Sequence, residues 1–277
     1  MPMNAAKLLL LNVLGGSAVD TSASFGVTTS GAQTLTINAL TMSAATTVDW
    51  GDGSQNVYTG SGARTHNYAG AGTWQVRILE PLNVTAFQLS QTTLVTNANS
   101  ANLKRMANIS HFELGQQPAG STCTFNSADV VDWRPMNFYL YSMSAGYAGT
   151  FDSADVSAWN PVEFRLSGFS SGFSAPISAA ADFAGWRRCT WLYMKDAALA
   201  STEVDRVLLG MNSAAASRTV TGGSIDLSGS NAAPSGTYAS ECPPTTGKGA
   251  AHSLLNNSCG TVNLGRVFTA ITVTGGL

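Results

Sequence analysis

The chain repeats itself between residues 112 and 193, with a period of about 26 residues. A Phe-x-Leu pattern recurs in each repeat, and a Ser-Ala-Asp-Val phrase followed by Trp recurs between its copies. A repeat this short cannot bury its apolar side alone, so neighbouring units must stack. The copies are Phe112-x-Leu114, Phe138-x-Leu140 and Phe164-x-Leu166, with Ser127–Trp133, Ser153–Trp159 and the shortened Ala181–Trp186 between and after them, and Phe87-x-Leu89 as an earlier unit.

Each unit predicts a short strand, a Gly/Ser turn and a capped helical turn. Phe and Leu lie on one face of the strand because successive side chains alternate. Ser or Asp in the second phrase can cap backbone N–H groups, and the Trp covers the strand from the other side. We expect the recurring aspartates to cap their own helical turns and the recurring tryptophans to pack in the core, rather than to form a carboxylate pair for glycoside hydrolysis or platforms for sugars. These residues are Asp129, Asp155 and Asp182, and Trp133, Trp159 and Trp186.

The repeat resembles leucine-rich repeats. Its run Phe151–Trp159 is most similar to the divergent BspA-type repeats of bacterial and phage surface proteins. The resemblance implies that residues 81–200 form a leucine-rich-repeat-like solenoid with a parallel sheet along one side.

Strand alternation also predicts an exposed row of side chains. Glu113, Tyr139 and Arg165 lie between the inward pairs of successive units, so they stack outward about 5 Å apart, and Tyr141 flanks them. Tyr and Arg are favoured at the centres of interfaces, which supports a contact surface for a protein partner or a glycan. The alternative is a solvated face stabilised by cross-strand pairs. In the fourth unit, Trp191/Tyr193 and Thr190/Leu192 compete for the inward face.

Residues 21–80 have the pattern of an all-β domain. The run Val48–Ser54 reads Val-Asp-Trp-Gly-Asp-Gly-Ser and is followed by His66-x-Tyr68 and by the run Gly72–Ile78. This order resembles the polycystic-kidney-disease (PKD) type of immunoglobulin-like domain, whose modules are spacers and adhesion units. We expect a core of Trp50, Tyr68, Trp74, Val76 and Ile78.

The Asp-Trp-Gly-Asp-Gly run predicts a structural turn formed by Asp49, Gly51, Asp52 and Gly53. Glycine permits positive φ, and Asp side chains cap backbone N–H groups in tight turns. His66 is expected to pack beside this turn. Calcium binding by the two aspartates is the alternative, but the ligand count is low for a calcium loop.

The last part of the chain, residues 201–277, predicts a helix at Ser201–Leu209, a loop region and a terminal strand at Phe268–Thr274. The helix, the phrase Ile225–Gly236 and the closing strand resemble the C-terminal segment of many tailed-bacteriophage virion proteins. Such a segment would cap the solenoid as an atypical last unit. Residues 1–20 are expected to be an N-terminal arm or first strand, and Glu80–Leu82 a linker.

Composition restricts the classes of partner. Charged residues make up 11% of the chain, against an average of about 25%. The 14 Lys and Arg residues form no basic stripe, so we expect no nucleic-acid partner. No apolar run is long enough to span a membrane, and the run Leu8–Leu11 ends at Asn12, which is short for a leader peptide.

Four cysteines without CxxC spacing argue against a zinc site, and no metal or cofactor is expected. Cys242 and Cys259 could form a disulfide or remain free thiols. Three histidines and no G-x-S-x-G motif give no support for a hydrolase. His111 starts a strand and is expected to point to solvent, while His252 has no obvious partner.

The sequence therefore predicts a mainly β protein with short helices, in which an Ig-like β-sandwich precedes a leucine-rich-repeat-like solenoid with a parallel sheet. The resemblances imply a non-enzymatic structural protein on the surface of a tailed-phage virion, either a capsid decoration or cement protein or a tail or fibre component. Its partners would be other virion proteins, copies of itself, or a host surface glycan or protein. A secreted bacterial adhesin or carbohydrate-binding protein is the alternative, and a polysaccharide depolymerase is a third hypothesis.

Overall fold

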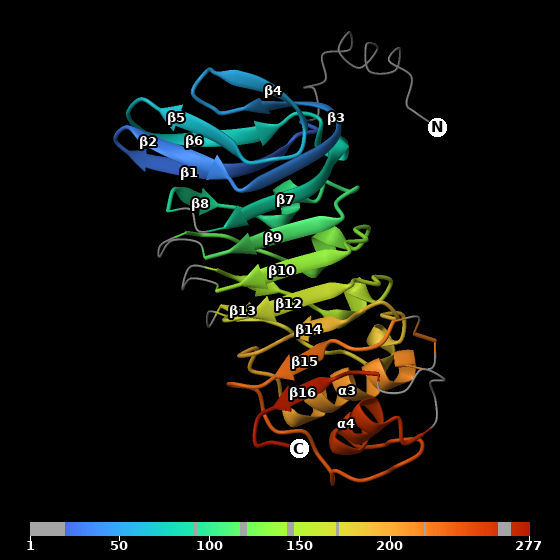
Figure 1. Ribbon diagram of the computed structural model, residues 1–277. Coiled ribbons are helices and arrows are strands. Elements are labelled where there is room, and N and C mark those ends of the chain that lie inside the picture. Colours follow the sequence, from blue (N-terminus) through green and yellow to red (C-terminus); the bar gives the residue numbers. More distant parts are fainter. Residues whose placement is uncertain are drawn as a thin grey trace, which may run out of the picture.

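The computed structural model describes residues 20–277 apart from 91–92, 117–120, 143–146, 170–171, 216, 219 and 260–266. The arm predicted at residues 1–20 lies outside the described residues except for Asp20. The predicted class is confirmed at the level of a mainly β chain with short helices. Most of the strands belong to one large mixed sheet, which the sequence did not predict. That sheet is antiparallel near one end of the molecule and parallel toward the other (Figure 1).

The N-terminal part, which we call the antiparallel region, comprises residues 23–78. Strand β1 pairs with β6 and β8, and β3 pairs with β4 and β6, while β2 and β5 form a separate two-stranded sheet. Phe25 and Val27 alternate inward along β1 and are fully buried. The strands are β1 (Ala23–Ser30), β2 (Gln33–Ile37), β3 (Ala39–Asp49), β4 (Gln55–Gly60), β5 (Arg64–Tyr68) and β6 (Ala71–Ile78), with β8 (Val95–Asn97) added from later in the chain.

Strand β7 (Val84–Ser90) joins the two kinds of pairing. It is antiparallel to β3 on one side and parallel to β9 (His111–Gly115) on the other, so that Phe87 is opposite Leu40 and Phe112. The segment expected to be a linker leads into a 3₁₀ turn, η1 (Pro81–Asn83), with Pro81 buried. The antiparallel and parallel strands thus belong to one hydrogen-bonded sheet.

The parallel strands follow one another in sequence order, and we call them the parallel stack. It consists of β7, β9, β10 (Asn137–Tyr141), β12 (Glu163–Ser167), β14 (Trp191–Tyr193), β15 (Ser224–Leu227) and β16 (Ala270–Val273). The Phe-x-Leu segments lie side by side in register, as predicted, with Phe112 opposite Phe138 and Phe138 opposite Phe164. The rings are stacked at centroid distances of 5.6 Å in both pairs. Figure 1 shows these strands as successive layers along the molecule.

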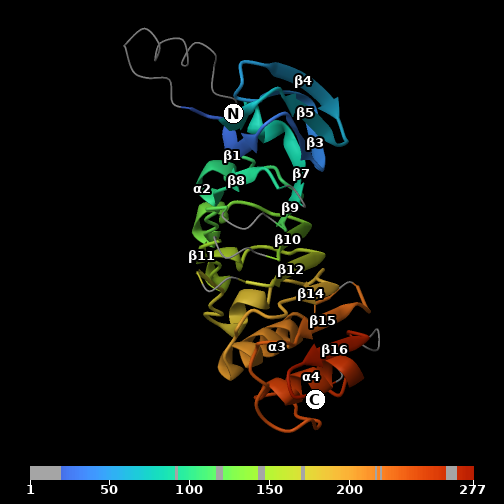
Figure 2. The same cartoon turned by 90° about the vertical axis from the view of Figure 1, so that its left-hand side faces the viewer.

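The side opposite the strands carries short helical segments, as Figure 2 shows for α2. They are α2 (Ser100–Leu103), η2 (Ser127–Val130), η3 (Ser153–Val156) and η4 (Ala180–Phe183), and two short strands, β11 (Gly149–Thr150) and β13 (Phe173–Ser174), pair nearby. The recurring tryptophans pack behind the phenylalanines, and all three are at most 1% exposed, as predicted for core residues. Their ring centroids lie 4.9–5.1 Å from those of Phe112, Phe138 and Phe164.

Asp129 and Asp155 act differently from the prediction, whereas Asp182 caps its own helical turn as predicted. Asp129 and Asp155 accept hydrogen bonds from Ser100 and Ser127 of the preceding unit, both at 2.6 Å. Asp182 accepts from Ser153 in the same way and also from the backbone N–H of Ala179 in its own unit. The prediction considered only local capping, whereas stacking brings the serine of one unit within reach of the next unit's carboxylate.

The C-terminal residues cover the end of the stack. Helix α3 (Ser201–Ala215) starts where predicted and continues further, and it packs against α4 (Gly247–Asn256), which lies in a region expected to be a loop. Cys242 and Cys259 form a disulfide. Within the described ranges no helix has both the length and the apolar character needed to cross a membrane.

Candidate functional site

The outward face of the parallel stack contains a hollow of about 380 Å³, which we call the outer groove. It lies over β9, β10, β12 and β14, which are adjacent in Figure 1. Glu113, Tyr139, Tyr141 and Arg165, predicted from the sequence as an exposed contact row, all line it. The prediction of exposure is wrong for Glu113, which is buried at 9% exposure by its neighbours' side chains, and the other three are partly buried. Glu163, Phe164, Trp191 and Tyr193 complete the lining.

The groove forms because the strands are in register. Glu113 is opposite Tyr139, Tyr139 opposite Arg165, and Arg165 opposite Tyr193. The next strand adds Asp226 opposite Tyr193. Neighbouring strands lie about 4.8 Å apart, so this row places charged side chains and tyrosines alternately along the groove.

The fourth strand settles which of its residues point inward. Leu192 is fully buried and lies opposite Phe164, whereas Trp191 is 50% exposed. The spacing from Trp186 to the inward residue is one longer than in the earlier units, and a one-residue shift moves every side chain to the other face of a strand. Sequence reasoning therefore left Trp191 unassigned. It also missed Glu163, although the alternation of Glu163 with the inward Phe164 was available to find it.

Glu113 is held as a charged acceptor. Its side chain receives a hydrogen bond of 2.5 Å from the Tyr141 hydroxyl. Burial by itself disfavours the charged form, but hydrogen bonds from His111, Tyr141, Gln88 and Ser90 outweigh it and lower the pKa of Glu113 to about 2. His111 was expected to point to solvent. Instead it is partly buried, with its Nε2 3.9 Å from the Glu113 carboxylate and its ring edge-on to Tyr139.

The groove tyrosines are hydrogen-bond donors to carboxylates. Tyr139 donates to Glu163 and accepts from the Asn137 amide at 3.1 Å. Burial, together with the bond to Glu163, raises the pKa of Tyr139. The pKa of Tyr141 is raised by burial and by Glu113, and that of Tyr193 by its hydrogen bond to Asp226. All three hydroxyls therefore stay protonated at neutral pH.

Arg165 lies at the centre of the row. Its guanidinium carbon is 4.4 Å from the centroid of the Tyr141 ring and 5.7 Å from that of Tyr193, and its Nε donates to Ser167 at 3.1 Å. Among the described residues, no carboxylate forms an ion pair with it. Its cationic head is positioned by aromatic rings and a hydroxyl, and its terminal N–H donors are not used by these contacts.

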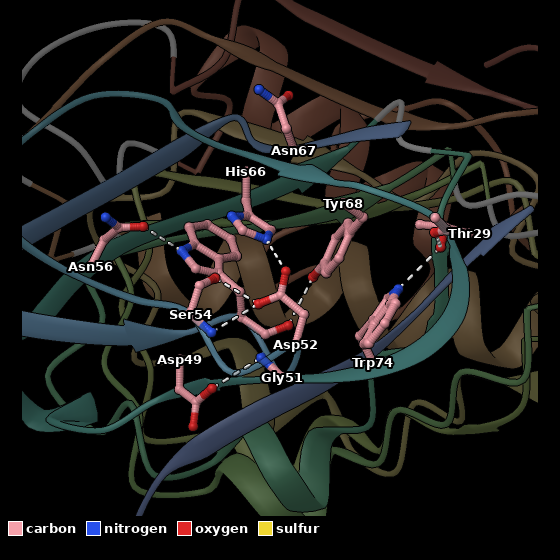
Figure 3. A network of polar contacts seen from close by, with 12 residues as sticks. Thr29, Asp49, Gly51, Asp52, Ser54, Asn56, His66, Asn67, Tyr68 and Trp74 are labelled. Atoms are coloured by element: carbon pink, nitrogen blue, oxygen red, sulfur yellow. Dashed lines mark hydrogen bonds and ion pairs between the residues drawn. The ribbon is translucent and has the colours of Figure 1, made fainter. Parts of the chain in front are cut away.

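A second cluster lies in the antiparallel region, around the turn predicted from the Asp-Trp-Gly-Asp-Gly run (Figure 3). Asp49 accepts from the Gly51 N–H at 2.9 Å, and Asp52 accepts from the Ser54 N–H at 3.0 Å and its hydroxyl at 2.6 Å. Gly51 and Gly53 have φ of +84° and +92°. A Cβ at Gly51 would also come 2.7 Å from the Gln75 carbonyl oxygen, so both backbone angle and space require glycine there.

His66 packs beside the turn. Its ring stacks on that of Trp50 at a centroid distance of 4.8 Å. Its Nε2 lies 2.7 Å from the Asp52 carboxylate (Figure 3). Burial opposes ionisation of Asp52, but hydrogen bonds from Ser54 and His66 outweigh it and lower the pKa to about 2. The Tyr68 hydroxyl donates to the Trp50 carbonyl at 3.0 Å. The polar groups of the cluster thus form hydrogen bonds with one another, as expected of a structural turn.

The remaining candidate residues are separate from both clusters. His252 lies 3.1 Å from the Ser258 hydroxyl and edge-on to Tyr238. Cys123 and Cys189 are buried thiols. In the part of the chain that the structure describes, no group of three or more His, Cys, Asp and Glu side chains is arranged to hold a metal ion.

Comparisons with protein-family models, with curated proteins and with solved structures found no match to this chain.

Proposed function

We propose that this chain is a non-enzymatic structural protein of a tailed-phage virion that presents the outer groove to a partner on or beyond the particle. In this proposal a PKD-type Ig-like part is joined to a leucine-rich-repeat-like solenoid that ends in a capping segment. The observation that carries the proposal is the convergence of Glu113, Tyr139, Tyr141 and Arg165 in one groove on the exposed face of the stack.

The groove is built on strands, which favours recognition. Side chains on rigid elements keep their geometry better than side chains on loops, so less conformational entropy is lost on binding. Behind the groove, the inward residues Phe138, Phe164 and Leu192 are at most 1% exposed and pack in register. On a particle with many copies, avidity would compensate for a weak single site.

The electrostatics of Glu113, Tyr139 and Tyr141 argue against two catalytic roles for these residues. A glycosidase needs one carboxylic acid that holds its proton near neutral pH. The pKa of Glu113 is lowered to about 2, so this carboxylate is ionised at neutral pH. The hydroxyls of Tyr139 and Tyr141 are bonded to carboxylates and their pKa values are raised, which disfavours nucleophilic phenolates.

The virion assignment is supported by the C-terminal segment. Its phrase Ile225–Gly236 begins in β15, and its closing strand includes β16, so the phage-like residues form the last two strands of the stack. A stack of repeats needs an atypical end unit to keep its apolar interior from solvent.

A secreted bacterial adhesin is the second candidate, and the Cys242–Cys259 disulfide is the observation that favours it. Disulfides persist mainly in oxidising, extracellular settings.

The experiment is mass spectrometry of purified particles made from the genome that encodes this chain. We expect the chain in the particles at a constant ratio to the capsid protein, and antibody labelling to locate it on their surface. Absence from particles together with presence on bacterial cells would overturn the proposal in favour of the adhesin. Release of reducing sugar from host capsule or lipopolysaccharide by the purified chain would instead establish a depolymerase.

A further inference from the structure

We infer that the outer groove is a binding site for a neutral saccharide, with Trp191 as its stacking platform. This inference rests on the proposed function, because it names the chemical class of the partner that the groove contacts. The volume of the outer groove, about 380 Å³, lies at the small end of the range typical of ligand pockets, about 300–1,000 Å³.

Trp191 supplies an aromatic surface that the core does not use. Leu192 takes the buried position of the strand, and the Trp191 side chain is left 50% exposed at the rim of the groove. An indole face carries negative partial charge and attracts positively polarised C–H groups. The C–H face of a pyranose ring has this property, so Trp191 can hold a sugar ring without charge.

The neighbouring polar groups are oriented for hydroxyl groups. Glu163 receives a hydrogen bond from Tyr139, and Tyr139 in turn receives one from Asn137, which fixes the carboxylate while leaving it further lone pairs for a ligand hydroxyl. Arg165, on the same strand as Glu163, offers N–H donors. Its guanidinium is positioned by the Tyr141 ring and by the hydrogen bond to Ser167. Acceptors and donors side by side match a ligand whose hydroxyls both donate and accept.

The charge pattern selects against charged ligands. The charged side chains that line the groove are the carboxylates of Glu113 and Glu163 and the guanidinium of Arg165. A basic peptide would meet the Arg165 cation, and an acidic sugar or a phosphate would meet the two carboxylates. An uncharged, polyhydroxylated ligand is repelled by neither the cation nor the carboxylates. A neutral saccharide is therefore the ligand that fits this groove.

The row also sets the size of the ligand. The groove covers four neighbouring strands, and a spacing of about 4.8 Å between strands gives a length of about 14 Å from β9 to β14. A short oligosaccharide lying across the strands would reach from Trp191 to Glu113.

The test is binding of the purified full chain to an array of immobilised neutral, amino and acidic oligosaccharides, followed by titration calorimetry with the strongest soluble hit. We expect hits among neutral saccharides, and an affinity that changes less than about twofold between low and high salt because no ion pair is formed with the ligand. Binding only to charged saccharides, or to none on the array, would overturn the inference.

Variants make the assignment residue-specific. Trp191→Ala should lower the affinity for the saccharide at least about tenfold, as expected for an aromatic residue at an interface centre. Glu163→Gln should lower the affinity about three- to tenfold, because a charge-assisted hydrogen bond becomes a neutral one. Tyr238→Ala is the matched control, since Tyr238 is an exposed aromatic residue outside the groove, and its affinity should equal that of the wild type. Unchanged affinity of a folded Trp191→Ala variant would contradict the inference.

A cell-binding assay separates this inference from the proposed function. Host cells treated with periodate, which cleaves vicinal diols, should lose binding of the chain, and cells treated with protease should keep it. Loss of binding after protease treatment, with binding kept after periodate, would indicate a protein receptor. That result would overturn the saccharide assignment but not the proposed function.

Discussion

The antiparallel region and the parallel stack bury their cores in different ways. In the stack, one contact type repeats between neighbours, so that Phe112, Phe138 and Phe164 form a continuous ring ladder. In the antiparallel region, the contacts around Trp50, Asp52 and His66 occur once and converge on a single turn. The repeated contacts of the parallel stack distribute its stability over several interfaces. The contacts of the antiparallel region meet at one turn, so the stability of that turn depends on single groups such as Asp52.

The largest effect is expected in the middle of the ring ladder. Phe138 is fully buried and has ring neighbours on both adjoining units and behind it, including Trp159 at 5.1 Å. Phe138→Ala should lower the free energy of unfolding by about 3–5 kcal/mol, measured by urea denaturation, because it opens a cavity at two interfaces.

Phe25→Ala is the matched change in the antiparallel region, where Phe25 is equally buried and packs edge-on against Phe87 at 6.0 Å. We expect a smaller loss than for Phe138→Ala. An equal or greater loss at Phe25 would remove the distinction between the two regions.

A smaller effect is expected for the hydrogen bonds between units. Ser127 is fully buried, donates to Asp155 at 2.6 Å and accepts from the Asp152 N–H at 2.8 Å. Ser127→Ala should lower the free energy of unfolding by about 1–3 kcal/mol, because two partly buried polar groups, the Asp155 carboxylate and the Asp152 N–H, lose a partner. Ser157→Ala is the control: its exposed hydroxyl bonds only within its own turn, to Ala154, and its loss should cost less than about 0.5 kcal/mol. Equal unfolding midpoints for the two variants would contradict a stabilising role for the serine–aspartate hydrogen bonds between units.

The smallest effect should be the one that depends on pH. The pKa of Asp52 is about 2 in the folded chain, below its ordinary value of 3.8. A lowered folded-state pKa gives stability that is present above about pH 4 and is lost as the pH falls toward 2. Solvent screening at this partly exposed turn limits the contribution to about 1 kcal/mol.

Asp52→Asn removes this contribution, so the difference in unfolding free energy between wild type and variant should shrink as the pH falls from about 5 to 2. Thermal unfolding at a series of pH values measures it. A difference that stays constant over this range would show that the charge of Asp52 does not contribute.

Much of the stack could be predicted from particular residues. The 26-residue spacing of Phe112, Phe138 and Phe164 predicted that their strands pair in register, because equal units must stack equally. Alternation then assigned Glu113, Tyr139 and Arg165 to the outward face, where they line the groove.

Other features depended on contacts that the local sequence does not contain. Helix α4 has Gly247 and Gly249 in its first turn, which weakens helix propensity, and it is stabilised by the Thr246 cap and by packing against α3. Local capping was predicted for Asp129 and Asp155, but stacking brought the serine of the preceding unit within hydrogen-bond distance of each carboxylate.

The sequence alone determined the period, the inward face of each complete unit and the glycine-dependent turn, because each follows from backbone geometry within a few residues. Tertiary structure decided which residue of the fourth strand is buried, which cysteines pair and that Trp191 lines the groove. The physical reason is that these outcomes depend on the free energy of packing one unit against the next, where a single extra residue shifts the register and exposes a tryptophan in place of a leucine.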